Sequence, residues 1–278
     1  MTPHKQTGNA GSPQESFAQT TPSYTEAFTV VAGTGTHKGS LLAYTSTLCR
    51  DSSYFQKSCS ERWSNPVNKT IRIKEFEFET FDLYYHWKLF GNIDLERIRY
   101  RDEHEINKAL ARIQALLKLY ITADYFEDGS LLINQVMDEL ILQLEWWKIE
   151  SPLALENIPT YVWANTSPES KLRRFVVDSC ATTATQEALK DETDFPTGFL
   201  KEILLRTIDF RGKPIWDFCP RVFSHCQYHV HKGESAAADK VECTVWAERQ
   251  HSLAAKKRRL VYEAEMMKGP PQKVSRTT

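Results

Sequence analysis

Several features that mark other protein classes are missing from this chain of 278 residues. It has no run of about 18 apolar residues, so no membrane-spanning helix is expected. Residues 1–25 lack the apolar core of a secretory signal, and the six cysteines form no C-x-x-C pair. These absences predict an intracellular protein, nuclear or cytoplasmic, whose cysteines are free thiols rather than a disulfide framework.

Net charge is nearly absent as well, because 35 Lys and Arg are balanced by 36 Asp and Glu. This balance gives no whole-protein reason to expect nucleic acid as a partner. With 41% hydrophobic and 12% aromatic residues, the chain can nevertheless bury a core. Its length fits one domain with an extension, or two small domains.

Catalytic motifs are missing too. The sequence contains no G-x-S-x-G elbow, no H-E-x-x-H helix and no Walker A loop. Gly33-Thr-Gly35 is a lone G-x-G in a predicted hairpin, which favours a turn. His104-Glu105 is followed by Lys at position 108, where a zinc helix needs its second histidine. The sequence therefore predicts no enzyme and no cofactor.

The first ordered part mixes predicted strands with short helices. Strands are predicted over residues 27–33, 40–44 and 71–76. Two short helices are predicted within 46–63, joined near Asp51 and Ser52, either of which can cap the second helix. A helix over 80–90 follows, with Thr80 as its N-cap and Gly91 at its end. A short edge strand is predicted at 93–95.

The strongest helical signal covers residues 105–126, where apolar residues recur every three or four positions over five turns. A second helix over 129–147 forms a helical hairpin with it. Further helices are predicted over 168–180, 197–208 and, with many charges, 246–265. Residues 1–25 are rich in Thr, Ser, Gln, Gly and Pro, which predicts a disordered tail.

Two motifs in the predicted helices are distinctive. One is Leu48-Cys49-x-x-Ser52-x-x-Phe55-x-x-x-Cys59, and the other is Leu117-Lys-Leu-Tyr-Ile-Thr-Ala-Asp-Tyr125. They resemble two helical segments of the BTB/POZ domain, in particular of the BTB proteins abundant in filamentous fungi. Residues 163–178 are similar to the segment that follows this domain in the fungal group. The family's His-Lys before the first motif is replaced by Tyr44-Thr45.

The resemblance implies an α+β class and a BTB/POZ fold, in which a small sheet packs against helical hairpins. This domain would cover residues 26–148, followed by a mainly helical extension over 149–245 and a charged helix with a basic tail over 246–278. It implies a protein–protein interaction module that forms homo- or hetero-oligomers, including a homodimer.

Residues of interface-forming types occur throughout this region, although core packing is the alternative for most of the aromatic ones. The interface candidates are Tyr54, Phe55, Trp63, Asn65, Trp146 and Trp147. BTB proteins that bind a cullin carry an apolar-x-Glu pattern, which falls here on Trp63-x-Asn65. The amide in place of the acid weakens the alternative of a cullin ubiquitin-ligase adaptor and leaves it open.

Cysteine and histidine gather near the end of the extension. The zinc-ligand candidates are Cys219, Cys226, His229, His231 and Cys243. Their types suit zinc, but they form no C-x₂₋₄-C half-site, so ordinary packing is favoured over a metal centre.

A basic run, Lys256-Lys257-Arg258-Arg259, lies in the predicted charged helix. Such a run serves nuclear import or phosphate contact, and a solvated helix face is the favoured alternative. A nuclear or chromatin-associated factor is therefore a second alternative function.

Overall fold

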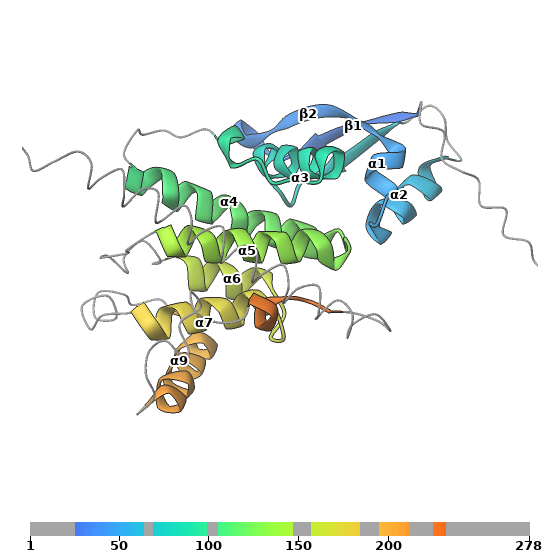
Figure 1. Cartoon of the computed structure of the whole chain (residues 1–278). Helices are drawn as coiled ribbons and strands as arrows, with labels where there is room; N and C mark the ends of the chain where they lie inside the picture. The colour runs from blue at the N-terminus through green and yellow to red at the C-terminus, as the bar shows by residue number, and fades with distance from the viewer. Residues whose placement is uncertain are drawn as a thin grey trace, which may run out of the picture.

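A computed structural model of the chain describes residues 26–63, 69–98, 105–146, 157–183, 195–211 and 225–231. The described part belongs to the α+β class. Figure 1 shows a small sheet at one end, with α3 beneath it and successive helices stacked below. The predicted tails and the predicted helix over 246–265 lie outside the described residues.

The sheet has three strands in the order β2-β1-β3. Strand β1 (Ala27–Ala32) pairs antiparallel with β2 (Gly39–Tyr44) and parallel with β3 (Thr70–Ile73). The predicted hairpin is confirmed, and β3 ends earlier than the predicted 71–76. A side chain at Gly39 would place its Cβ 2.3 Å from the Phe78 ring, so glycine lets the sheet lie against α3.

The two predicted short helices are α1 (Thr45–Cys49) and α2 (Ser53–Trp63). Ser52 caps the second of them, because its Oγ accepts a hydrogen bond from the backbone N–H of Phe55 at 3.3 Å. The same hydroxyl donates to the carbonyl of Phe126 at 2.7 Å. One buried serine therefore starts α2 and ties it to the turn after α4.

Helix α3 (Phe78–Phe90) ends as predicted at Gly91, which has a φ of 74° and donates its N–H to the Trp87 carbonyl. The prediction of Thr80 as N-cap is wrong. The helix begins two residues earlier, its N-cap is Glu77, and Thr80 is buried within the first turn.

The predicted strand at 93–95 is also wrong. This stretch enters a short 3₁₀ turn, η2 (Leu95–Arg97), in which the Asp94 carboxylate accepts a hydrogen bond from the N–H of Glu96. A side-chain acceptor that bonds its own backbone favours a turn over an extended strand.

The long helical hairpin consists of α4 (Glu105–Tyr125) and α5 (Ser130–Trp146). Below it lie α6 (Ile158–Asn165), α7 (Lys171–Thr183), α9 (Thr197–Phe210) and the turn η5 (His225–Tyr228) (Figure 1). The sequence pattern missed α6, a helix of 8 residues. One cluster of buried apolar side chains runs from the sheet to η5, so these layers share a core.

Candidate interaction surfaces

A fully enclosed ion pair joins three elements of the N-terminal part. Lys88, on α3, places its Nζ 3.0 Å from Oδ1 of Asp128, and neither side chain is exposed. The ammonium also donates to the Arg50 carbonyl, after α1. Burial lowers the pKa of Lys88, and the charge of Asp128 opposes that shift. The pair faces no opening, so it holds α3 against the α4–α5 turn.

A second buried carboxylate organises the C-terminal helices. Asp178, on α7, accepts two hydrogen bonds from the Arg206 guanidinium, at 2.5 and 3.1 Å, and one from the Tyr228 hydroxyl at 2.9 Å. The hydrogen bonds to Asp178 raise the pKa of Arg206. Helix α9 and η5 are thereby both attached to α7. We name these three residues the Asp178 latch.

Side-chain hydrogen bonds attach the segment after η5 to α5. His229 places Nε2 2.9 Å from Oδ1 of Asp138, and both side chains are buried. Asn134 accepts a hydrogen bond from the Val230 N–H at 2.8 Å and donates to its carbonyl. Among the described side chains, no group with metal-ligand geometry includes His229.

Of the other zinc candidates, His231 is the one whose side chain the structure describes. The ring centres of His229 and His231 are 6.3 Å apart. Cys219, Cys243 and the side chain of Cys226 lie outside the described residues. Within the described ranges, the one group with metal-ligand geometry is His37, Glu77 and Glu79 at the surface. Glu77 there pairs with Lys118 at 2.6 Å, and the cluster needs no ion to account for it.

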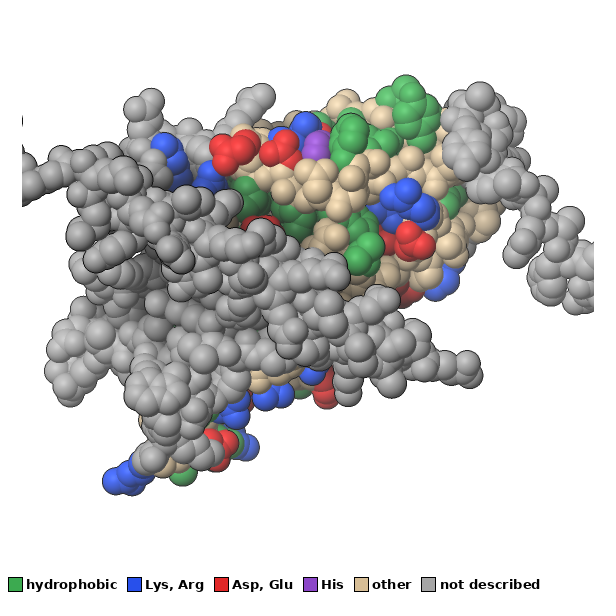
Figure 2. Space-filling view, in the orientation of Figure 1, with side chains coloured by type: hydrophobic (Ala, Val, Ile, Leu, Met, Phe, Trp, Pro, Cys, Tyr) green, Lys and Arg blue, Asp and Glu red, His purple; other side chains and the backbone are tan. Residues whose placement is uncertain are grey.

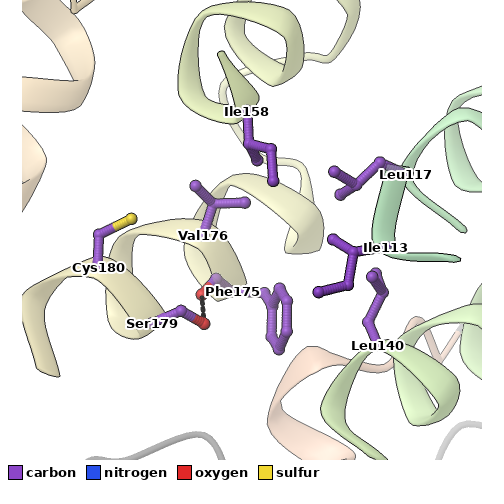
Figure 3. A pocket seen from close by; sticks show the side chains of 8 residues that line it. All are labelled: Ile113, Leu117, Leu140, Ile158, Phe175, Val176, Ser179 and Cys180. Carbon is purple, nitrogen blue, oxygen red and sulfur yellow. Dashed lines mark hydrogen bonds between the residues drawn. The ribbon is translucent and has the colours of Figure 1, made fainter. Parts of the chain in front are cut away.

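A small apolar cavity lies where α4, α5, α6 and α7 meet (Figure 3). Its volume is about 20 Å³, room for a single water at most. The Ser179 hydroxyl at its edge donates to the Phe175 carbonyl. Burial raises the pKa of Cys180 to about 12, so its thiol stays protonated at neutral pH. The cavity offers neither space for a substrate nor an activated nucleophile.

Large apolar side chains face solvent on the outer side of β2. Leu42 is 66% exposed and Tyr44 is 48% exposed. Alternate residues of a strand share one face, so these two side chains stand together. Figure 2 shows hydrophobic side chains gathered over this strand at the top of the molecule. We name Leu42 and Tyr44 the outer β2 face.

A second exposed apolar surface lies on α9, at the end of the molecule opposite the sheet (Figure 1). Leu200, Leu204, Leu205 and Ile208 are 45–61% exposed. Their spacing of four, one and three residues places them on one side of the helix. The opposite side buries Phe199 and Phe210. We name these four exposed residues the α9 stripe.

The interface candidates chosen from the sequence lie elsewhere. The choice of Phe55 is wrong, because its ring is fully buried and packs 4.7 Å from that of Phe126. Tyr54 is half-buried against the same aromatic cluster. The side chains of Trp63 and Trp146, and all of Asn65 and Trp147, lie outside the described residues, as does the basic run over 256–259.

Sequence reasoning did not single out the outer β2 face or the α9 stripe. The signal for the stripe was available, since both sides of α9 carry large apolar residues and a helix at the edge of a small protein can bury only one. For Leu42 and Tyr44 the hint was similar, since apolar residues follow one another along β2 and therefore occupy both faces of the strand.

Comparisons with protein-family models, with curated proteins and with solved structures found no match. Within the described ranges, no helix combines the length and apolar character needed to cross a membrane. The surfaces above must therefore be interpreted from their own chemistry.

Proposed function

We propose that this chain is a protein–protein interaction module of the BTB type, which associates with a second copy or a related chain through the outer β2 face. The order of its elements supports the BTB interpretation. A hairpin, two short helices, a third strand, a helix and a long helical hairpin follow one another, as the resemblance implies.

The residues of the two family-like motifs lie at a helix cap and in the core, which also supports the BTB interpretation. Ser52 caps α2 as the first motif requires, and Leu48 and Cys59 are buried beside it. In the second motif, Leu117 and Tyr120 of α4 are buried in the core. The residues that carry the resemblance are thus residues that build the α1–α2 unit and pack it on α4.

The single observation that carries the proposed interaction is the outer β2 face. Leu42 and Tyr44 are large and apolar, yet they project into water on an edge strand. When a partner buries the exposed half of such a side chain, each one stabilises the interface by roughly 1–2 kcal/mol. Aromatic side chains of this type often anchor interfaces.

The backbone of β2 adds a second recognition element. The Tyr44 N–H points away from β1, because it donates to the Tyr85 hydroxyl at 2.8 Å. With a period of two, the N–H and C=O groups of Leu42 also point away from β1. An edge strand of this kind is suited to pairing with an extended segment of another chain.

The experiment replaces Leu42 by lysine in the full chain. We expect the wild-type protein to form an oligomer and Leu42→Lys to lower its mass, because a charge cannot be buried against the partner. Light scattering coupled to size exclusion, over protein concentrations of roughly 10–100 µM, measures the mass directly.

Leu131→Lys is the matched control, since Leu131 is 62% exposed at the start of α5, away from the sheet. It should leave the mass unchanged. If both variants behave like the wild type, or if the wild type is monomeric throughout, the outer β2 face is not an association surface. Circular dichroism of both variants establishes that each is folded.

A further inference from the structure

The exposed side of α9 consists of two neighbouring rows of side chains. Residues four apart on a helix lie one above the other. The first row is Leu200, Leu204 and Ile208, all apolar. The second row is Lys201, Leu205 and Asp209, which reads positive, apolar, negative along the helix. All six side chains are exposed to solvent.

From this arrangement we propose that α9 forms a second self-association surface, on which the α9 helices of two copies pair antiparallel about Leu204 and Leu205. Reversal leaves the first row apolar against apolar, with Leu200 of one copy against Ile208 of the other. The α9 surface is separate from the outer β2 face, and this proposal does not depend on the function proposed for the outer β2 face.

The second row selects the antiparallel direction. Lys201 and Asp209 each lie four residues from Leu205, about 6 Å along the axis. Reversing one helix about Leu205 places Lys201 of one copy beside Asp209 of the other, twice across the two-fold axis. A parallel pairing would instead place lysine beside lysine and aspartate beside aspartate, which repel.

The rest of the helix is fixed so that these rows face outward. The Asp178 latch attaches α9 to α7 through Arg206. The Phe199 ring packs against that of Trp163, with ring centres 5.2 Å apart. Gly198 allows the close approach of α9 to that indole, because a Cβ there would lie 3.0 Å from Trp163 Nε1. The stripe therefore cannot turn inward without breaking these contacts.

One helix face is smaller than the roughly 800 Å² per partner of a standard stable interface, so the dimer should be weak, with a dissociation constant in roughly the micromolar range or above. Its test is sedimentation velocity on the full chain carrying Leu42→Lys, so that association through the outer β2 face is removed. Concentrations should span about 10–300 µM.

Charge reversal provides the decisive variants. Lys201→Glu and Asp209→Lys, each alone, turn both attractive pairs into repulsive ones, and each should weaken the dimer roughly tenfold. The double variant Lys201→Glu/Asp209→Lys restores opposite charges and should return the dissociation constant to near its original value. Circular dichroism of each variant establishes that it is folded.

Leu204→Glu should abolish the dimer, and high salt should shrink the difference between the single and double variants. A monomer at every concentration, or single variants that sediment like the parent, would overturn the proposal. Failure of the double variant to recover would overturn the antiparallel register. The proposed function fails on a different result, namely when Leu42→Lys has the same mass as the wild type.

Discussion

Two of the buried carboxylates in the described part of the chain, Asp128 and Asp178, pair with a lysine and an arginine that differ in their access to water. Lys88 is completely enclosed beside Asp128, whereas a quarter of the Arg206 side chain beside Asp178 reaches the surface. Burial lowers the pKa of Lys88, and hydrogen bonds to Asp178 raise that of Arg206. Desolvation therefore wins at the first pair and hydrogen bonding at the second.

This difference predicts that the region around the Lys88–Asp128 pair unfolds as one unit, whereas α9 can separate from its neighbours locally. At the Lys88 pair, removing either partner leaves the other as an unpaired buried charge without access to water. At the Asp178 latch, a guanidinium that loses its partner can still be hydrated, so the consequence is detachment rather than unfolding. We therefore expect the sheet, α3 and the α4–α5 turn to form one cooperative body, whereas α9 is joined to the helices below it by the latch and by the Phe199 ring.

The largest expected effect comes from Lys88→Met. It leaves the Asp128 carboxylate buried without its cation, and we expect the free energy of unfolding to fall by about 3–5 kcal/mol. Urea denaturation followed by tryptophan fluorescence measures this change. Because the whole N-terminal body depends on the pair, the transition should stay cooperative while its midpoint falls.

Lys118→Met is the matched control, because Lys118 and Glu77 form an ion pair of which about a third is exposed on each side. It should cost less than about 1 kcal/mol. Adding Asp128→Leu to Lys88→Met should recover most of the loss, since no buried charge remains. Equal costs for the two lysine substitutions would show that enclosure of the Lys88 pair has no energetic consequence.

Asp178→Asn should have a smaller and more local effect. The amide cannot accept from both Arg206 and Tyr228 as a carboxylate does, and charge-assisted hydrogen bonds contribute about 1.5–3 kcal/mol. We expect faster hydrogen exchange at the amides of α9, with those of α4 nearly unchanged. Asp124→Asn, at an exposed position of α4, should leave both helices as protected as before. A uniform loss of protection would mean that α9 is part of the cooperative body.

The elements whose stability comes from one apolar face were predictable from sequence. The apolar residues that recur over 105–126 predicted α4, and Gly91 predicted the end of α3. Ser52 was expected as a cap, but its second hydrogen bond reaches Phe126, 74 residues away, which no local pattern contains. The strand predicted at 93–95 failed because the Asp94 side chain competes for the backbone.

The surfaces were less predictable than the elements. Aromatic residues were favoured as interface anchors, yet Phe55 lies in the core, where its ring packs against those of Phe81, Tyr84 and Phe126. The two exposed surfaces consist of four aliphatic residues on α9 and of Leu42 and Tyr44 on β2, none of which had been selected. Periodicity shows that a face is apolar, and only the tertiary packing decides whether another element covers it.

The last prediction concerns the reactivity of two cysteines, one in each of these regions, and involves no change in stability. Cys49, after the sheet, has a lowered pKa, caused first by a hydrogen bond with Cys59 and then by the charge of Lys88, against the opposing effect of burial. Cys180, on α7, has its pKa raised by burial to about 12. At pH 7.5, iodoacetamide should modify Cys49 at least roughly a hundredfold faster, since only the thiolate reacts.

Peptide mass spectrometry assigns each modification to its cysteine, so the remaining cysteines do not confuse the result. Asp178→Asn should speed the modification of Cys180, two residues away on the same helix, only if the latch also keeps α7 packed so that Cys180 stays buried. An unchanged rate would confine the effect of the latch to α9. Rapid modification of Cys180 in the wild-type protein would contradict its burial, and with it the view that α7 belongs to the body to which α9 is attached.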